Sequence, residues 1–305
     1  MISLSLSGNY RVSPDLEQNN WRLIGTNVNV MRILAWLVSV FLMTVSTGSL
    51  AMDTRFLQGL GDAHYTRIES EILARHFHVF VMLPDGYEQS PEEDYPTIYL
   101  LDGGALFPLL SAYYRYLNFG EEIPDAIVVG ISYGSDSFEE GNYRSTDYTA
   151  KSPERDYWGG ADKFQSFLSD ELLPFIERTY RSRTDRRVIF GQSLGGQFVL
   201  YTALTRPGLF WGHVASNPAL HRNLPFFLQT HGKAEIAGER PRLFVASGSE
   251  DDPRFRIPTL EWVEHWSNND DNPWQLKTMT LEGHTHMSAP PASFRQGVTW
   301  LFSQD

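Results

Sequence analysis

The 305-residue sequence contains no cysteine. It therefore has no thiol nucleophile, no cysteine-ligated metal and no disulfide bond. Basic residues are also few, because 25 Lys and Arg stand against 37 Asp and Glu, for a formal net charge of −12. This balance argues against nucleic acid as a partner, since phosphate binding requires clustered Lys and Arg. Export remains compatible with the composition, because a chain of this length can bury a core that is stable without cross-links.

A long hydrophobic run is also lacking. The apolar run Ile33–Val45 is shorter than the roughly 20 residues of a transmembrane helix. It follows Met31-Arg32 and precedes small residues that end at Ala51, which is the pattern of a secretory signal peptide. We therefore expect an over-extended start at residues 1–30, a signal peptide at 31–51 and a periplasmic or secreted protein. The alternative is an uncleaved anchor, which would hold the protein at a membrane.

Residues 52–305 are expected to form one domain of the α/β class. Apolar segments alternate with longer amphipathic ones, which is typical of a mostly parallel central sheet flanked by helices. Short continuous apolar runs suit strands that are buried on both faces. The predicted strands are His76–Leu83, Thr97–Leu101, Ala126–Ile131, Val188–Phe190, His213–Ala215, Leu243–Ala246 and Leu276–Leu281.

The clearest predicted helix spans Ala161–Tyr180, where apolar residues recur at helical spacing. Pro174 should kink this helix or end its regular part. Further predicted helices cover Leu194–Leu204, Leu260–Trp266 and Ser293–Phe302.

Gly191-Gln-Ser193-Leu-Gly195 matches the Gly-x-Ser-x-Gly pattern of a nucleophile elbow. In such an elbow a strand turns sharply into a helix, and the serine hydroxyl is exposed on the turn. The pattern occurs a second time, around Ser132. An apolar strand precedes Ser193 and a helix-compatible run follows it, whereas polar loop residues follow Ser132. We therefore predict Ser193 as the nucleophile and Ser132 as an ordinary loop serine.

A serine nucleophile needs a base, and a carboxylate usually orients that base. In α/β-hydrolases the acid and then the histidine follow the serine in the chain. Predicted strands after Ser193 end in the acidic run Glu250-Asp251-Asp252 and in His284-Thr-His286. We prefer Asp251 as the acid and His286 as the base. Glu250, Asp252, a solvated turn with no acid, and His284 remain alternatives.

The backbone N–H of Leu194 is expected to point into an oxyanion hole, since it follows the nucleophile. The second donor should come from the loop after an early strand, and there we choose Gly104 in Asp102-Gly103-Gly104. The alternative is that these glycines only form a tight turn, which would have the same sequence.

Two pairs, His284-x-His286 and His76-x-His78, have a spacing that a metal site could use. No cysteine and no matched carboxylate spacing accompany them. We therefore predict neither a metal nor another cofactor.

Several segments together resemble a known esterase family of α/β-hydrolases, which includes enterochelin (siderophore) esterases, S-formylglutathione hydrolases, feruloyl esterases and mycolyltransferases. The resemblance covers nearly all of residues 70–303. It rests on segments that begin at Val81, Tyr95, Arg144, Phe167, Gly191 and His286 and that read VMLPDGY, YPTIYLLDGG, RSTDYT, FLSDELLPFIE, GQSLGG and HMS.

The resemblance implies an α/β-hydrolase fold and hydrolysis of a small-molecule ester through an acyl-enzyme. By matching motifs it places the nucleophile at Ser193, the base at His286 and the acid at Asp251. It also places the oxyanion donors at Gly104 and Leu194. Within the family, the enterochelin-esterase-like branch is the most similar.

Two departures limit what the resemblance implies. Gln192 stands before the nucleophile, where His is common, and some relatives work with a Ser-His dyad. An exported location argues against a glutathione thioester as substrate. An acyltransferase with the same catalytic residues and a non-catalytic binding protein on the same fold are the alternative functions.

Overall fold

The structure is a computed structural model that describes residues 58–61, 63–137, 142–229, 239–269 and 272–303. All described residues belong to one compact unit, Thr54–Asp305. The predicted extension at 1–30 and the predicted signal peptide at 31–51 lie outside the described residues. Among the helices in the described ranges, none is both long and apolar enough to cross a bilayer.

Within the described residues, eight strands form one sheet in the order β1-β2-β4-β3-β5-β6-β7-β8. The first two strands run antiparallel to their neighbours, and the pairs from β4 to β8 are parallel. The prediction of a mostly parallel α/β sheet is therefore confirmed. The strands are β1 (Ala63–Ser70), β2 (Arg75–Met82), β3 (Tyr95–Leu100), β4 (Ile127–Ile131), β5 (Ser182–Gln192), β6 (Gly212–Ser216), β7 (Arg242–Gly248) and β8 (Gln275–Leu281).

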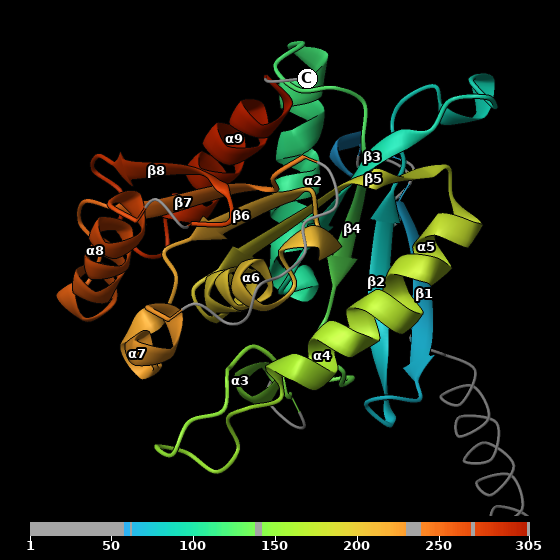
Figure 1. Ribbon diagram of the computed structural model, residues 1–305. Helices are drawn as coiled ribbons and strands as arrows, with labels where there is room; N and C mark the ends of the chain where they lie inside the picture. The colour runs from blue at the N-terminus through green and yellow to red at the C-terminus, as the bar shows by residue number, and fades with distance from the viewer. Residues whose placement is uncertain (1–57, 62, 138–141, 230–238, 270–271, 304–305) are drawn as a thin grey trace, which may run out of the picture. The chain divides into compact units, whose positions relative to one another are not determined.

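Helices cover both faces of the sheet (Figure 1). On one face α2 and α9 bury residues such as Phe107 and Phe294 against the strands. On the other face α4, α5, α6 and α8 bury residues such as Phe164, Phe198 and Trp262. The helices are α2 (Gly103–Phe119), α3 (Arg144–Asp147), α4 (Ala161–Phe167), α5 (Leu173–Thr179), α6 (Leu194–Thr205), α7 (Leu224–Phe227), α8 (Pro253–Ser267) and α9 (Ala289–Phe302).

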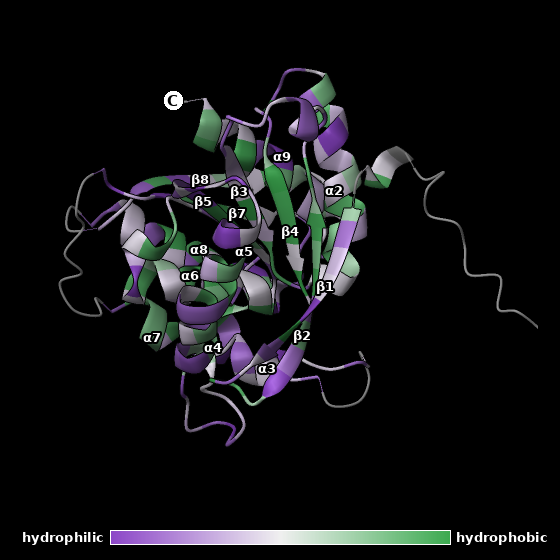
Figure 2. Ribbon diagram, turned by 90° about the vertical axis from the view of Figure 1, so that its right-hand side faces the viewer, coloured by the Kyte–Doolittle hydropathy of each residue, from purple (hydrophilic) through white to green (hydrophobic). Residues whose placement is uncertain are grey.

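The central strands are more apolar than the antiparallel edge. In Figure 2 β4 is green (hydrophobic), whereas β1 and the beginning of β2 are purple (hydrophilic). All five residues of β4 are buried, while most of β1 is exposed or half-buried. The antiparallel edge therefore presents polar side chains to solvent, which is common for such strands.

The predicted helix Ala161–Tyr180 forms as α4 and α5, joined by a five-residue π-helical segment, Leu168–Leu172. Pro174 lies in the first turn of α5, directly after this segment. Proline cannot donate to the carbonyl four residues before it, and the wider π turn accommodates this loss. The predicted interruption at Pro174 is confirmed, although the chain stays helical through it.

Candidate active site

The turn from β5 into α6 holds Ser193 in a conformation that is rare for a residue with a side chain. Its φ is 59° and its ψ is −115°, and α6 begins at the next residue, Leu194. Such a backbone costs roughly 1–3 kcal/mol and persists where the surrounding structure imposes it. The Ser193 N–H donates to the Ser216 carbonyl at 3.0 Å, and the Ser193 carbonyl accepts from Ala219 N–H at 3.0 Å.

The glycines around Ser193 are required because backbone segments approach closely. A Cβ on Gly191 would lie 2.3 Å from the carbonyl carbon of Gly195. A Cβ on Gly196 would lie 2.8 Å from the Ser216 carbonyl oxygen. Neither neighbour is a flexible side chain that could move aside. The structure therefore forms the strand–turn–helix elbow that the pattern around Ser193 predicted.

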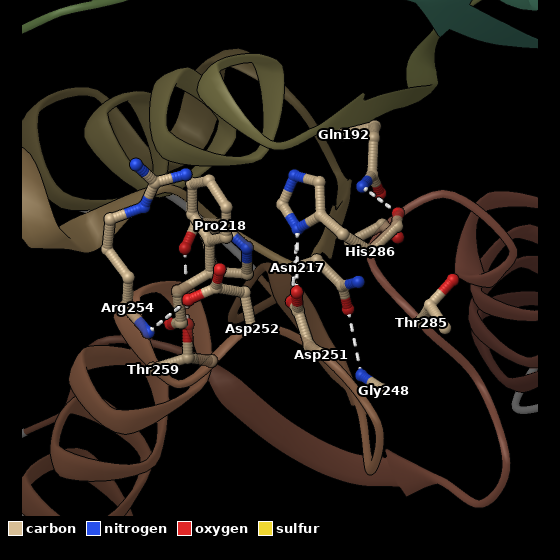
Figure 3. A network of polar contacts seen from close by, with 12 residues as sticks. Gln192, Asn217, Pro218, Gly248, Asp251, Asp252, Arg254, Thr259, Thr285 and His286 are labelled. Carbon is tan, nitrogen blue, oxygen red and sulfur yellow. Dashed lines mark hydrogen bonds and ion pairs between the residues drawn. The ribbon is translucent and has the colours of Figure 1, made fainter.

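The loops that follow β7 and β8 bring Asp251 and His286 together (Figure 3). Nδ1 of His286 lies 3.1 Å and 3.0 Å from the two carboxylate oxygens of Asp251. The Asp251 side chain is 1% exposed and the His286 side chain is 17% exposed. A carboxylate only accepts hydrogen bonds, so Nδ1 carries a proton, and in the neutral imidazole Nε2 then keeps its lone pair. A lone pair on Nε2 is what a general base requires.

The neighbouring acids serve other contacts. Glu250 is exposed, and its backbone N–H donates to the His284 carbonyl at 3.0 Å. The Asp252 carboxylate caps α8 by accepting from Arg254 N–H at 2.8 Å. His284 places its Nδ1 3.1 Å from the Ser288 carbonyl oxygen. Of the candidate acids and bases, the structure pairs Asp251 with His286.

Two further residues hold His286 in place, one through its ring and one through its backbone. The Phe255 ring stacks on it, with ring centroids 4.2 Å apart and an interplanar angle of 25°. The Gln192 side chain donates to the His286 carbonyl at 2.8 Å (Figure 3). Gln192 precedes Ser193, so this bond ties the loop of the histidine to the elbow. The role of Gln192 could not be found from sequence spacing, because 94 residues separate it from His286.

The first turn of α2 supplies Gly104, the second predicted oxyanion donor. The Asp102 carbonyl is the first acceptor of α2 and accepts from Ala105 and Leu106 N–H at 2.9 Å each. The N–H groups of Gly103 and Gly104 come before these donors and therefore have no acceptor within the helix. A Cβ on Gly103 would clash with Ile131 N at 2.3 Å, whereas Gly104 is exposed, with the Tyr133 ring 3.9 Å from such a Cβ.

Leu194 is the first residue of α6, and its N–H likewise has no partner within its own helix. The two helix starts are neighbours, because a Cβ on Gly195 would lie 3.2 Å from an Asp102 carboxylate oxygen. The structure thus brings Leu194 and Gly104 to one edge of the sheet.

An ion pair between the half-buried Arg144 and the buried Asp102 connects the two helix starts to α3. Arg144 Nε lies 2.6 Å and its Nη2 lies 2.9 Å from the two carboxylate oxygens of Asp102. The same Nη2 donates to the Gln192 carbonyl at 3.3 Å. Burial alone would lower the pKa of Arg144, but the Asp102 carboxylate outweighs it and holds the pKa above its ordinary value. Sequence reasoning assigned no role to Arg144, although the motif that begins there contributed to the family resemblance.

Ser193 lines a cavity of about 130 Å³ whose wall is rich in cations. Arg222 and Arg254 line it and have no ion-pair partner among the described residues. Burial, and then the nearby Arg144 and Arg254, lower the pKa of Arg222. Burial together with Arg222 and Arg254 lowers the pKa of His221 to about 4, so this ring is neutral at pH 7. A larger cavity, of about 770 Å³, lies beside β1 and the start of α2, and none of the residues that line the Ser193 cavity line it.

The second Gly-x-Ser-x-Gly match has a structural role. Ser132 is 6% exposed, and its hydroxyl accepts from His78 N–H at 3.0 Å. Its own N–H donates to the His78 carbonyl at 3.0 Å, so it continues the pairing of β4 with β2. No helix begins at Ser132, because the described residues that follow it, up to Ser137, form bends and irregular chain.

Known proteins are similar to this chain in sequence and in fold. Ferri-bacillibactin esterase BesA of Bacillus subtilis is 36% identical over 170 residues, which are 51% of this chain and 57% of that protein. The match thus spans less than two thirds of this relative. The structure of the BES protein from Bacillus cereus superposes with a TM-score of 0.70 at 24% identity, over 79% of this chain and 95% of that one.

An IroE-like serine hydrolase from Shewanella oneidensis superposes with a TM-score of 0.69 at 25% identity, over 79% of this chain and 80% of that one. These matches agree with the α/β-hydrolase fold and with the resemblance drawn from the motifs. The family model described as "Putative esterase" matches residues 70–289, and the chain belongs to this family.

Proposed function

We propose that the protein is a serine carboxylic-ester hydrolase that works through an acyl-enzyme. Ser193 is the nucleophile, His286 the general base and Asp251 the acid that orients it. The observation that carries this proposal is the buried Asp251–His286 pair, whose loop is bonded through Gln192 to the elbow of Ser193. The same pair favours catalysis over a non-catalytic binding function, which would require neither an oriented base nor a strained elbow.

The geometry is suited to the following sequence of steps. Nε2 of His286 accepts the hydroxyl proton as the oxygen of Ser193 attacks the ester carbonyl carbon. The N–H groups of Leu194 and Gly104 stabilise the negative charge that develops on the carbonyl oxygen. The imidazolium, stabilised by Asp251, then protonates the departing alcohol, and an acyl-enzyme remains. Water, activated by the same histidine, releases the acid and restores Ser193.

The substrate that we propose is a siderophore-type or another small-molecule ester. Two similar proteins support this, since BesA of Bacillus subtilis is a ferri-bacillibactin esterase and a relative from Escherichia coli is an apo-salmochelin esterase. The wall of the Ser193 cavity adds a physical argument. Arg222 and Arg254 are cations without an ion-pair partner in the described chain, although the whole protein carries a net charge of −12. An ester with an anionic acid or alcohol part would neutralise them.

Export to the periplasm or medium is the remaining part of the proposal. It rests on residues 31–51, and the expected mature chain begins after Ala51. Intact-mass measurement of protein from the periplasm or medium checks this. A mature chain that retains residues 33–45 would support a membrane anchor instead.

The decisive experiment is covalent labelling with a fluorophosphonate. Ser193→Ala should abolish both labelling and ester turnover, because no acyl-enzyme can form. Ser132→Ala is the matched control, since it removes the serine of the second motif and should keep the label. Label that stays on the Ser193 variant and vanishes from the Ser132 variant would refute the assignment. Product analysis with an added alcohol separates hydrolysis from acyl transfer, which uses the same residues.

A further inference from the structure

Two histidines and an aspartate meet on the antiparallel part of the sheet, at the carboxyl end of β4. In the strand order β4 and β3 separate β2 from β5, and β7 and β8 lie further along. Nε2 of His76 and Nε2 of His78 lie 2.9 Å and 2.8 Å from the same carboxylate oxygen of Asp136. All three ligand atoms lie within 4.8 Å of one another. The reaction proposed for Ser193 uses none of these residues.

The strand explains why both imidazoles point to one side. Alternate residues of a strand face opposite sides of the sheet. Phe77 lies between the two histidines and is fully buried, with its ring stacked 4.3 Å from Phe167 of α4. His76 and His78 therefore face away from α4 and are 19% and 22% exposed. Asp136 follows β4, 60 residues after His76 and 58 after His78, and its side chain is 74% exposed.

We propose that His76, His78 and Asp136 form a surface site for a divalent transition-metal ion of the zinc type. Two imidazole nitrogens and one carboxylate oxygen are ligands that Zn²⁺ prefers, and water completes such a set. Zn–N and Zn–O bonds of about 2.0–2.2 Å place tetrahedral ligand atoms about 3.3 Å apart. The two nitrogen–oxygen contacts need to open by about half an ångström, and the exposed Asp136 side chain can supply that movement. The two Nε2 atoms lie within 4.8 Å of each other, and rotation of the imidazoles must bring them to the tetrahedral separation.

The Nδ1 atoms of the two histidines have different partners. A histidine that binds a metal through Nε2 keeps its proton on Nδ1 and donates it to a neighbouring acceptor. For His78 that acceptor is present, because the Tyr65 hydroxyl lies 2.8 Å from its Nδ1. For His76 the neighbour is Arg67 Nη2, at 3.0 Å, and a guanidinium can only donate. Each Nε2 now lies against a carboxylate oxygen, which only accepts, so each neutral imidazole carries its proton on Nε2. Both histidines must therefore move that proton to Nδ1 when the ion binds, and Arg67 must in addition release His76.

Arg67 is free to do so. It is 50% exposed and already pairs with Glu69 at 3.0 Å. Arg67→Gln should consequently tighten metal binding by about tenfold, because a glutamine oxygen can accept the Nδ1 proton of His76 without adding a positive charge beside the ion. Weaker binding in this variant would overturn the assignment of His76 as a ligand.

Isothermal titration of tag-free protein with Zn²⁺ tests the site. One ion per chain should bind, and Asp136→Asn and His78→Gln should each weaken it by at least about tenfold. Asp136 is exposed, so Asp136→Asn does not disturb the core, and far-UV circular dichroism checks that both variants fold. Cobalt(II) provides a second readout, since ligand-field absorption of the bound ion should disappear in the same variants.

His284→Gln is the matched control, because His284-x-His286 repeats the spacing of His76-x-His78 near Ser193. This variant should bind Zn²⁺ as the unaltered protein does. Absence of saturable binding, or binding that is lost in His284→Gln and retained in Asp136→Asn, would overturn the proposal. The result does not depend on ester turnover, so it stands apart from the function proposed for Ser193.

Discussion

Replacing Asp251 by Asn tests whether Asp251 and His286 act as a catalytic unit. In the structure both carboxylate oxygens lie about 3 Å from Nδ1, and the Asp251 side chain is 1% exposed. The asparagine amide can donate to Nδ1, which favours the tautomer with its proton on Nε2. That tautomer cannot accept the proton of Ser193. The neutral amide also stabilises the imidazolium less than a carboxylate does.

The expected loss in kcat is about 10⁴-fold, as for Ser-His-Asp triads in general. This corresponds to a rise of about 5.4 kcal/mol in the activation barrier. The substitution hardly changes side-chain volume, and the backbone bond from Asp251 N–H to the Gly248 carbonyl remains. We therefore expect the fold to persist and KM to change little, because substrate contacts with Asp251 are precluded by its burial.

Initial rates on a short-chain p-nitrophenyl ester measure the effect, with circular dichroism as the check on folding. Glu250→Gln is the matched control, since this exposed neighbour makes no side-chain contact with His286. A loss in Asp251→Asn of less than about tenfold, or about 1.4 kcal/mol, would show a Ser-His dyad and refute the reasoning. A severe loss in Glu250→Gln alone would move the acid by one residue.

Three further predictions follow from other parts of the structure. The double variant Arg222→Gln, Arg254→Gln should lose its preference for an anionic ester over the neutral analogue. The ratio of the two kcat/KM values should fall by at least about tenfold, because each charged contact contributes about 1 kcal/mol or more. An unchanged ratio would exclude these arginines from anion recognition. Arg144→Met should lower the free energy of unfolding by about 3–5 kcal/mol in urea titration, because it strands the buried Asp102 carboxylate; a loss below about 1 kcal/mol would contradict this. Burial lowers the pKa of His213 to about 3 in the folded protein, whereas in the unfolded chain the ordinary value of about 6.5 applies. Between these two pH values His213 is protonated in the unfolded chain and neutral in the folded one. Stability should therefore fall as the pH drops through this window, by about 1.4 kcal/mol per pH unit, and His213→Phe should remove that part of the slope.

The helix α2 shows where sequence patterns mislead. It was not predicted, because Gly103, Gly104 and Pro108 are residues that usually weaken or interrupt a helix. In the fold Gly103 is needed for close contact with β4, since a Cβ there would lie 2.3 Å from Ile131 N. Phe107 and Leu110 then bury the helix against the sheet. Tertiary packing, rather than helix propensity, stabilises this element.

β1 was missed for a related reason. Its sequence, Ala63–Ser70, alternates exposed and half-buried residues and lacks a continuous apolar run. Its hydrogen bonds to β2 hold it in the sheet. Edge strands of this kind are hard to predict from local sequence, because hydrogen bonds to the partner strand stabilise them more than burial of their own side chains does.

The elements that the sequence determined are those with local causes. The elbow at Ser193 requires glycines at fixed offsets, because the backbone at the end of β5 comes into close contact with the backbone at the start of α6. The buried parallel strands appear as short apolar runs for an equally local reason, since both of their faces are covered.

Only the tertiary structure decided which side chains meet. Asp251 and His286 are 35 residues apart, and three adjacent acids competed for one contact. The bonds of Arg144 to Asp102 and of Asp136 to His76 join segments that are 42 and 60 residues apart. No local pattern encodes such pairs, because they depend on where the order and register of the strands bring separate loops together.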